Sequence, residues 1–295
     1  MKANEPHAAD FILAAGMPRA GSTWLYRNIS QHPQGNVSRL KETNFFSINY
    51  YRGRGWCDAL YKDTAHAHAK FDISPFYFLE PDFIANVKKE NINAKVLMIL
   101  REPNIWVRSL YYQIKSYTLN MPKFEDFIKE HVIKFDTQPR TINLLDFKFL
   151  DRVNELINAF QNNILLINFD LIANDPVKLL KEVENFAGLS SYFNDTNVIT
   201  SQINASHSQF RFINFLSTNR YLRTIANMLP FTSVTDYIKR KLYKENVTQF
   251  KDIRQQKDIA EKDKYELLAQ EKNIDELFPP VFKEKFFKDK DIVYL

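Results

Sequence analysis

The sequence predicts an α/β fold of three layers, in which helices cover both faces of a central parallel sheet. Three short apolar segments, at residues 11–15, 96–100 and 164–169, have the length and composition of buried strands. A segment with helical signals follows each of them. Strands that alternate with helices favour parallel pairing, and sheets of this kind bind ligands at the carboxyl ends of their strands.

The helices are expected at residues 22–32, 103–119 and 176–188. Pro103 and Pro176 suit a first helical turn, and Gly188 suits a helix end. Each of these helices follows a predicted strand, which completes the alternation. Beyond residue 206 the pattern is mainly helical.

Composition places the chain among globular proteins. Of its 295 residues 45% are hydrophobic, which is ample for a packed core. No Gly/Pro/Ser-rich linker divides the chain, so we expect a single domain over residues 1–295, with an α/β core at 1–205 and a mainly helical C-terminal part at 206–295. No apolar run reaches the ~18 residues that span a bilayer, and no signal peptide precedes the first strand, so no integral membrane segment is expected.

Charge and cysteine content narrow the ligands and the environment. The net charge of +5 suits an anionic ligand, and a solvated basic surface would give the same value. Acidic and basic residues alternate from 239 to 291, which argues against a nucleic-acid partner. The single cysteine, Cys57, excludes an internal disulfide and fits a reducing compartment.

A glycine-bounded turn joins the first predicted strand to the first predicted helix. It reads Gly16-Met17-Pro18-Arg19-Ala20-Gly21-Ser22-Thr23, and its glycines are two of only six in the chain. Backbone amides that converge at a helix N-terminus bind phosphate, so the turn predicts a P-loop-like fold with a phosphate cradle. A triphosphate-binding loop carries lysine where this chain has Ser22, and here the cation is Arg19. The simpler alternative is an ordinary turn in which Ser22 caps the helix.

Two further groups of residues are candidates for ligand contacts. Arg101 follows the second predicted strand directly and Ser109 lies two helical turns later, so both can hold a second phosphate. An arginine in a surface ion pair is the alternative. Lys41 and Glu42 place a base and an acid side by side ahead of two aromatic residues, and a surface charge pair is the alternative there.

Together these segments resemble the sulfotransferase family that uses 3′-phosphoadenosine 5′-phosphosulfate (PAPS), as a bacterial-like member of the carbohydrate branch related to heparan sulfate sulfotransferases. The likeness covers about the first two thirds of the chain, and ordered motifs are more specific than a single one. The matching segments are the glycine turn with Trp24-Leu25 (5′-phosphosulfate loop), Lys41-Glu42 with Phe45-Phe46 (Lys-Glu element), Asp72-Ile73-Ser74-Pro75-Phe76-Tyr77 (Ser/Thr-Pro-x-Tyr element), residues 101–112 (3′-phosphate motif) and residues 169–189 (a later strand and helix).

The resemblance implies transfer of a sulfuryl group from PAPS to a hydroxyl or amine of a carbohydrate or glycoconjugate acceptor, with the bisphosphate PAP as product and no metal required. Glu42 is then the catalytic base, Arg19 stabilises the leaving phosphate, and Lys41 orients the sulfuryl group or Glu42. The residues expected to bind the nucleotide are Pro18, Arg19, Ala20, Gly21, Ser22, Thr23, Trp24, Arg101 and Ser109. Those expected to contact the acceptor are Asp72, Tyr77 and His207.

The chain departs from the family pattern at several points. Arg19 replaces the usual lysine, Asp72 stands where glutamate is common, and the Lys-Gly-Arg cofactor loop of the heparan enzymes is not found near the C-terminus. Histidine is the rival base, because cytosolic small-molecule sulfotransferases use one. His207 lies in a polar run, and His32 is expected at a helix end.

Two other functions stay open. A P-loop nucleotide kinase would bind ATP with magnesium, and the missing lysine argues against it. A non-catalytic protein that binds PAP or PAPS would keep the phosphate cradle without turnover. A PAPS-dependent enzyme of this kind is expected in the cytoplasm, where PAPS is made, and the sequence leaves the acceptor and the oligomeric state open.

Overall fold

The computed structural model describes residues 9–62, 69–115, 121–129, 131–133, 140–200, 274–288 and 290–294. Contacts divide the chain into two units, and the first comprises Met1–Gln113, Pro122–Ser206 and Pro279–Leu295. Of the second unit, the described residues are 114–115, 121 and 274–278. The helical pattern expected beyond residue 206 therefore lies largely outside the described residues, and the single domain stays a prediction.

The centre of the first unit is a six-stranded sheet in the order β2-β3-β1-β4-β7-β8. All neighbouring strands pair in parallel except β7 and β8, which are antiparallel. The three predicted strands are confirmed as β1, β4 and β7. The strands of the sheet are β1 (Phe11–Gly16), β2 (Asn36–Val37), β3 (Lys70–Ile73), β4 (Ala94–Leu100), β7 (Ile164–Asn168) and β8 (Ile292–Tyr294), and β5 (His131–Ile133) and β6 (Arg140–Ile142) form a separate antiparallel pair.

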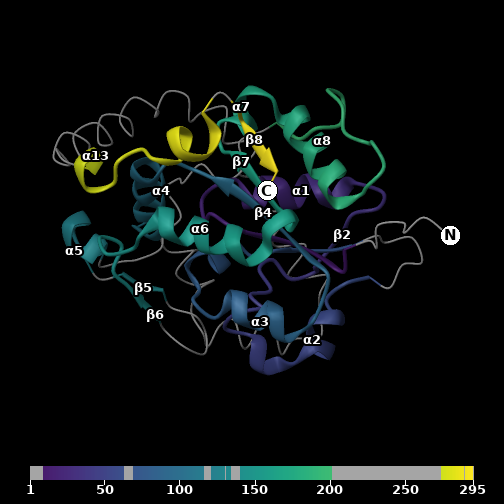
Figure 1. Ribbon diagram of the computed structural model, residues 1–295, viewed down its shortest axis with the longest axis horizontal. Coiled ribbons are helices and arrows are strands. Elements are labelled where there is room, and N and C mark those ends of the chain that lie inside the picture. The colour runs from purple at the N-terminus through teal and green to yellow at the C-terminus, as the bar shows by residue number, and fades with distance from the viewer. Residues whose placement is uncertain are drawn as a thin grey trace, which may run out of the picture. The chain divides into compact units, whose positions relative to one another are not determined.

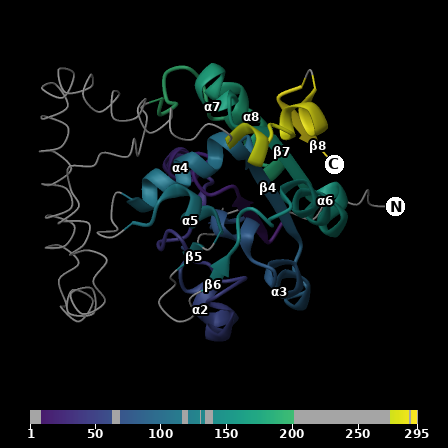
Figure 2. The same ribbon diagram turned by 90° about the vertical axis from the view of Figure 1, so that its left-hand side faces the viewer.

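Helices cover both faces of this sheet, which confirms the three-layer α/β fold. Helices α1 and α8 lie on one face, and α3 and α6 lie on the other (Figures 1 and 2). The predicted helices are confirmed as α1, α4 and α8, and Gly188 ends α8 with a left-handed φ of 70°. The helices are α1 (Ser22–Gln31), α2 (Arg54–Asp58), α3 (Phe83–Lys89), α4 (Pro103–Lys115), α5 (Phe124–Lys129), α6 (Phe149–Phe160), α7 (Leu171–Asn174), α8 (Pro176–Ala187) and, in the second unit, α13 (Ile274–Leu277).

The strand order places a topological switch point at the centre of the sheet. The chain leaves β1 toward β3 on one side and returns to β4 on the other, so the connections after β1 and β4 diverge at the carboxyl ends of two adjacent strands. Every residue of β1 is buried, and so is every residue of β4 except Lys95. A rigid, apolar pair of strands thus positions the two loops that carry the predicted anion contacts.

The C-terminal end contributes a strand that the sequence does not predict. Ile292–Tyr294 form β8, whereas the pattern indicated a helical part up to residue 295. Glu102 holds the segment that precedes this strand. Its carboxylate accepts hydrogen bonds from the amides of Val281, Phe282 and Lys283 at 2.8, 3.1 and 2.6 Å. A three-residue strand carries too little periodicity to be identified without its neighbour.

Candidate active site

The turn after β1 has the geometry of an anion-binding loop. Gly21 adopts a left-handed φ of 82°, which favours glycine, and a Cβ atom there would also lie 2.3 Å from Cδ1 of Ile172, so that the isoleucine side chain would have to move. Helix α1 begins at the next residue with no acidic side chain in its first turn and no side-chain cap. The first amides of a helix have no acceptor within the helix, so they present hydrogen atoms and partial positive charge to an anion.

Neighbouring strands and helices hold the backbone of this loop. The amide of Met17 donates to the carbonyl of Ile99 at 2.8 Å, and the amide of Ala20 donates to the carbonyl of Met17 at 3.1 Å. The indole of Trp106 donates to the carbonyl of Pro18. The side chains of Pro18 and Ala20 are buried, so these two residues shape the loop through the backbone.

Two arginines from different loops meet beside it. Arg19 has a left-handed φ of 63°, and its Nε donates to Oγ of Ser109 at 3.4 Å. Arg101, directly after β4, donates from Nη1 to the carbonyl of Arg19 at 3.0 Å. The guanidinium of Arg101 lies 4.4 Å from the centre of the Phe169 ring. The structure thus brings together Arg19, Arg101 and Ser109, which are 90 residues apart at most.

The electrostatics of Arg101 favour a bound anion. Burial and the adjacent charge of Arg19 lower the pKa of Arg101 to about 10, and Asp170 offsets part of this effect. The Nε of Arg101 is buried and has no hydrogen-bond partner among the described residues. A buried donor without an acceptor costs free energy, and a negatively charged oxygen would supply that acceptor.

The predicted catalytic pair lies beside the start of α1. Nζ of Lys41 is 3.4 Å from Oε1 of Glu42 and 3.3 Å from Oγ of Ser22, so the lysine bridges the acid and the anion loop. The side chains of Lys41 and Glu42 are 17% and 23% exposed. Burial raises the pKa of Glu42 above the ordinary carboxyl value; Lys41 works against this shift, and the charge of Asp72 adds to it.

Two residues expected to contact the acceptor do not reach the surface. Asp72 and Tyr77 are both 0% exposed, and Oη of Tyr77 donates to Oδ2 of Asp72 at 2.7 Å. Direct contact with an acceptor therefore does not fit them, because their polar atoms bond to each other beneath the Lys41-Glu42 segment. The third candidate, His207, lies outside the described residues.

The aromatic segment after Glu42 divides between core and surface. Phe45 and Phe46 are fully buried, whereas Tyr51 is 65% exposed. The guanidinium of Arg52 lies 5.3 Å from the Tyr51 ring centre and 5.0 Å from that of Trp56. An exposed ring with a guanidinium held over it is a surface that an anionic sugar can contact.

The ring of Trp24, a residue predicted to bind the nucleotide, is buried and bonded to another segment. Its indole donates to the carbonyl of Ile199, and the side chain is 5% exposed. The amide of Ile199 in turn donates to Oδ1 of Asn28 at 2.9 Å. The ring of Trp24 therefore ties α1 to the segment after α8, while its amide belongs to the first turn of α1.

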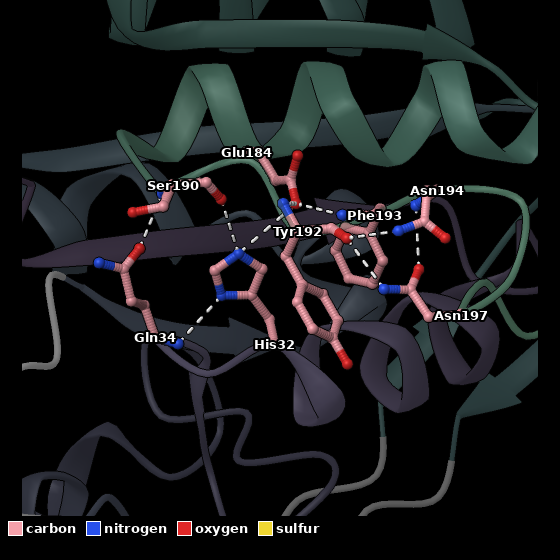
Figure 3. Close-up of polar contacts among 8 residues, drawn as sticks. All are labelled: His32, Gln34, Glu184, Ser190, Tyr192, Phe193, Asn194 and Asn197. Atoms are coloured by element: carbon pink, nitrogen blue, oxygen red, sulfur yellow. Dashed lines mark hydrogen bonds and ion pairs between the residues drawn. The ribbon is translucent and has the colours of Figure 1, made fainter.

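His32 also ties α1 to α8 and the segment after it, as Figure 3 shows. It is the C-cap of α1 and so lies at the opposite end of that helix from the anion loop. The amide of Gln34 donates to Nδ1 of His32 at 3.0 Å, so the proton of the ring is on Nε2, which lies 3.0 Å from the carbonyl of Ser190 and 3.5 Å from Glu184. Ten residues of helix span about 15 Å. His32 is thus a structural residue and not a rival base.

Replacing Glu184 by alanine should destabilise the protein by about 3 kcal/mol. The Glu184 side chain is 2% exposed, and its Oε1 accepts from the amides of Tyr192 and Phe193 at 2.8 and 2.9 Å, which the variant leaves without an acceptor. Urea denaturation measures the loss. Lys181→Ala, an exposed change on the same helix, is the control, and an equal loss in both variants would contradict the role of the carboxylate.

Sequence reasoning missed the residues that support the site. Trp106 and Phe169 hold Pro18 and Arg101, and the hydroxyls of Thr43 and Ser74 surround Asp72. The one signal in the sequence for these hydroxyl groups was Thr43, which follows Glu42 directly.

Within the described ranges, no cluster of three or more His, Cys, Asp or Glu side chains suits a metal ion. No helix in the part of the chain that the structure describes has the length and hydropathy to cross a bilayer.

Comparisons with known proteins agree on one family. The model of the sulfotransferase domain matches residues 9–264. Heparan sulfate glucosamine 3-O-sulfotransferase 3A1 of Mus musculus is 22% identical over 190 residues, which are 63% of this chain and 48% of the relative. Heparan sulfate glucosamine 3-O-sulfotransferase 6 of Homo sapiens is 23% identical over 186 residues, with 62% and 53% covered. The chain thus spans about half the length of these relatives.

The fold has a counterpart among solved structures. A sulfotransferase from Alicyclobacillus acidocaldarius superposes with a TM-score of 0.53 at 21% identity, covering 66% of this chain and 86% of that chain. The likeness concerns the fold.

Proposed function

We propose a function for this chain from the family to which it belongs, the sulfotransferase domain family. The chain transfers the sulfuryl group of PAPS to a hydroxyl or amine of a carbohydrate or glycoconjugate. One observation carries this proposal. Arg101, whose buried Nε lacks a partner among the described residues, bonds to the backbone carbonyl of Arg19 and feels the charge of that arginine, beside an uncapped helix N-terminus. Such a pair of cationic sites suits a nucleotide with phosphate at both its 3′ and 5′ positions.

The residues present fit that nucleotide. The glycine turn and the first amides of α1, with the hydroxyls of Ser22 and Thr23, would hold the 5′ end, and Arg101 with Ser109 would hold the 3′-phosphate. Arg19 links these two sets of residues, because its Nε donates to Ser109 and its backbone carbonyl accepts from Arg101. The left-handed φ of Gly21 favours glycine at this position of the loop.

The proposed chemistry follows from the charges around Lys41 and Glu42. When bound, PAPS supplies the sulfuryl group. Glu42 accepts the proton of the acceptor hydroxyl or amine, and its raised pKa brings a carboxylate closer to the strength that this task needs. Lys41 holds Glu42 and faces the anion loop through Ser22, and Arg19 stabilises the charge that develops on the leaving phosphate. Turnover without a divalent metal stays a prediction, which transfer assays in EDTA test.

A carbohydrate acceptor is supported by the relatives, which are named for heparan sulfate glucosamine. The exposed Tyr51 and Arg52 offer a ring and a cation for an anionic sugar. The location in a bacterial cytoplasm is a further prediction, which cell fractionation tests.

The test has two stages. Thermal shift with PAP and with ATP plus magnesium should show stabilisation by PAP alone, because the loop lacks the lysine of triphosphate enzymes. Selective stabilisation by ATP would favour a nucleotide kinase. Transfer of labelled sulfate from PAPS to a panel of glycans should then follow, and PAP binding without transfer to any glycan would favour a non-catalytic nucleotide-binding protein.

A further inference from the structure

We propose that Asp72 is a positioning residue for the proposed reaction, and that it fixes the catalytic Glu42 through three hydroxyl groups. This inference rests on the proposed function, since it concerns the base of that reaction. Asp72 lies in β3, 30 residues after Glu42, and its side chain is fully buried.

The carboxylate of Asp72 accepts three hydrogen bonds from side chains. Oγ1 of Thr43 and Oη of Tyr77 each donate to Oδ2 at 2.7 Å, and Oγ of Ser74 donates to Oδ1 at 2.6 Å. These short distances are typical of hydroxyl groups that donate to an ionised carboxylate. An aspartate is therefore surrounded on both oxygens by donors.

The same three hydroxyls each accept one backbone amide. The amides of Asn44, Phe45 and Phe46 donate to Ser74, Thr43 and Tyr77 at 3.0, 3.1 and 3.0 Å, respectively. A hydroxyl has a single proton, so one that donates to Asp72 is free to accept from an amide. All three proton directions thus depend on an acceptor at Asp72.

These amides belong to the segment that carries the base. Thr43 follows Glu42 directly, and the next three residues bear the bonded amides. Two side-chain amides support the same segment from outside the cluster, because Asn49 donates to the carbonyl of Thr43 at 2.7 Å and Asn86 donates to that of Phe46 at 3.1 Å. The path from Asp72 to Glu42 is therefore a short and rigid stretch of backbone.

The charge of Asp72 also acts on Glu42. Of the described groups, Lys41 and Asp72 are the charges that shift the pKa of Glu42, the first lowering it and the second raising it. Besides the hydroxyl of Tyr77, the groups that interact electrostatically with Asp72 are Lys41, Tyr61 and Cys57. Removing its charge should lower the pKa of Glu42, so the acid limb of the pH profile should move to lower pH.

The decisive variant is Asp72→Asn, because the amide brings donors to a site that needs an acceptor. We expect kcat to fall roughly 10- to 100-fold while the dissociation constant for PAP stays within about twofold. Hydrogen exchange of the amides of residues 44–46 in the ligand-free protein should become about tenfold faster or more. Unchanged exchange together with unchanged kcat would overturn the proposal.

Two comparisons separate positioning from stability. Tyr77→Phe removes one hydroxyl and no charge, so it should reproduce the faster exchange without the shift of the pH profile. Glu184→Gln makes the same carboxylate-to-amide change at a buried position outside the site, and should leave kcat and the exchange of residues 44–46 unchanged. An equal loss of kcat in Glu184→Gln would show that general destabilisation explains the effect.

The proposed function can fail separately. If the unmodified protein does not bind PAP, or if Glu42→Gln retains turnover, the assignment of the reaction or of the base is wrong, and hydrogen exchange still tests the link from Asp72 to residues 44–46. If Glu42→Gln is inactive while Asp72→Asn has normal exchange and turnover, the positioning role alone is wrong.

Discussion

Replacing Arg101 by alanine is expected to weaken PAP binding by about 100-fold, which corresponds to about 3 kcal/mol. The guanidinium is largely buried against Phe169 and beside Arg19, and its Nε has no acceptor in the described part of the chain. An interaction with a 3′-phosphate would be formed in this desolvated place, where a charged hydrogen bond is strong. Isothermal titration calorimetry measures the change.

The nucleotide itself supplies the control for Arg101→Ala. Adenosine 5′-monophosphate lacks the 3′-phosphate, so its affinity should be the same for the variant and the unmodified protein. Lys88→Ala removes an exposed cation at the end of α3 and should leave PAP binding intact. This variant controls for the loss of one positive charge from the protein. Equal weakening for both nucleotides would place Arg101 away from the 3′-phosphate.

The central part of the fold could be predicted from the sequence, because the residues that indicate each strand and helix lie within that element or next to it. Strands β1, β4 and β7 are almost wholly apolar, and the helices that follow begin or end at glycine or proline. Strands β3 and β8 were missed because one is four residues long with a buried aspartate and the other is three residues long. Only the neighbouring strands make these segments extended.

For the site, the sequence identified side chains better than their roles. Arg19, Arg101 and Ser109 were predicted to bind phosphates, and the fold brings these three together. Asp72 was expected to contact the acceptor, but it is fully buried, and a buried charge needs partners. Its hydrogen-bond partners are Thr43, which precedes it in the sequence, and Ser74 and Tyr77, which follow it. The spacing of these residues in the sequence does not show that their hydroxyl groups converge on one carboxylate.

Glu42→Gln should lower kcat by about 10²- to 10⁴-fold, which is the usual contribution of a general base. Glutamine has nearly the same shape, so the dissociation constant for PAP and the melting temperature should change little. The side chain is 23% exposed, which leaves it accessible to an acceptor. Nζ of Lys41 donates both to Oε1 of Glu42 at 3.4 Å and to Oγ of Ser22 at 3.3 Å, so the lysine holds the carboxylate beside the anion loop. Initial rates at saturating PAPS measure the effect.

The pH dependence of the same reaction gives the sign of the Glu42 titration. Burial raises the pKa of Glu42, so the protonated and inactive form should persist to a higher pH than for an ordinary carboxyl group. We therefore expect kcat/KM to decrease as the pH falls through this raised pKa, and the residual rate of Glu42→Gln to lack that limb. Glu90→Gln is the matched control, because Glu90 is similarly exposed at 17% and bonds to Tyr50 outside the site. Normal turnover in Glu42→Gln, with loss of turnover in His207→Ala, would instead identify the histidine as the base.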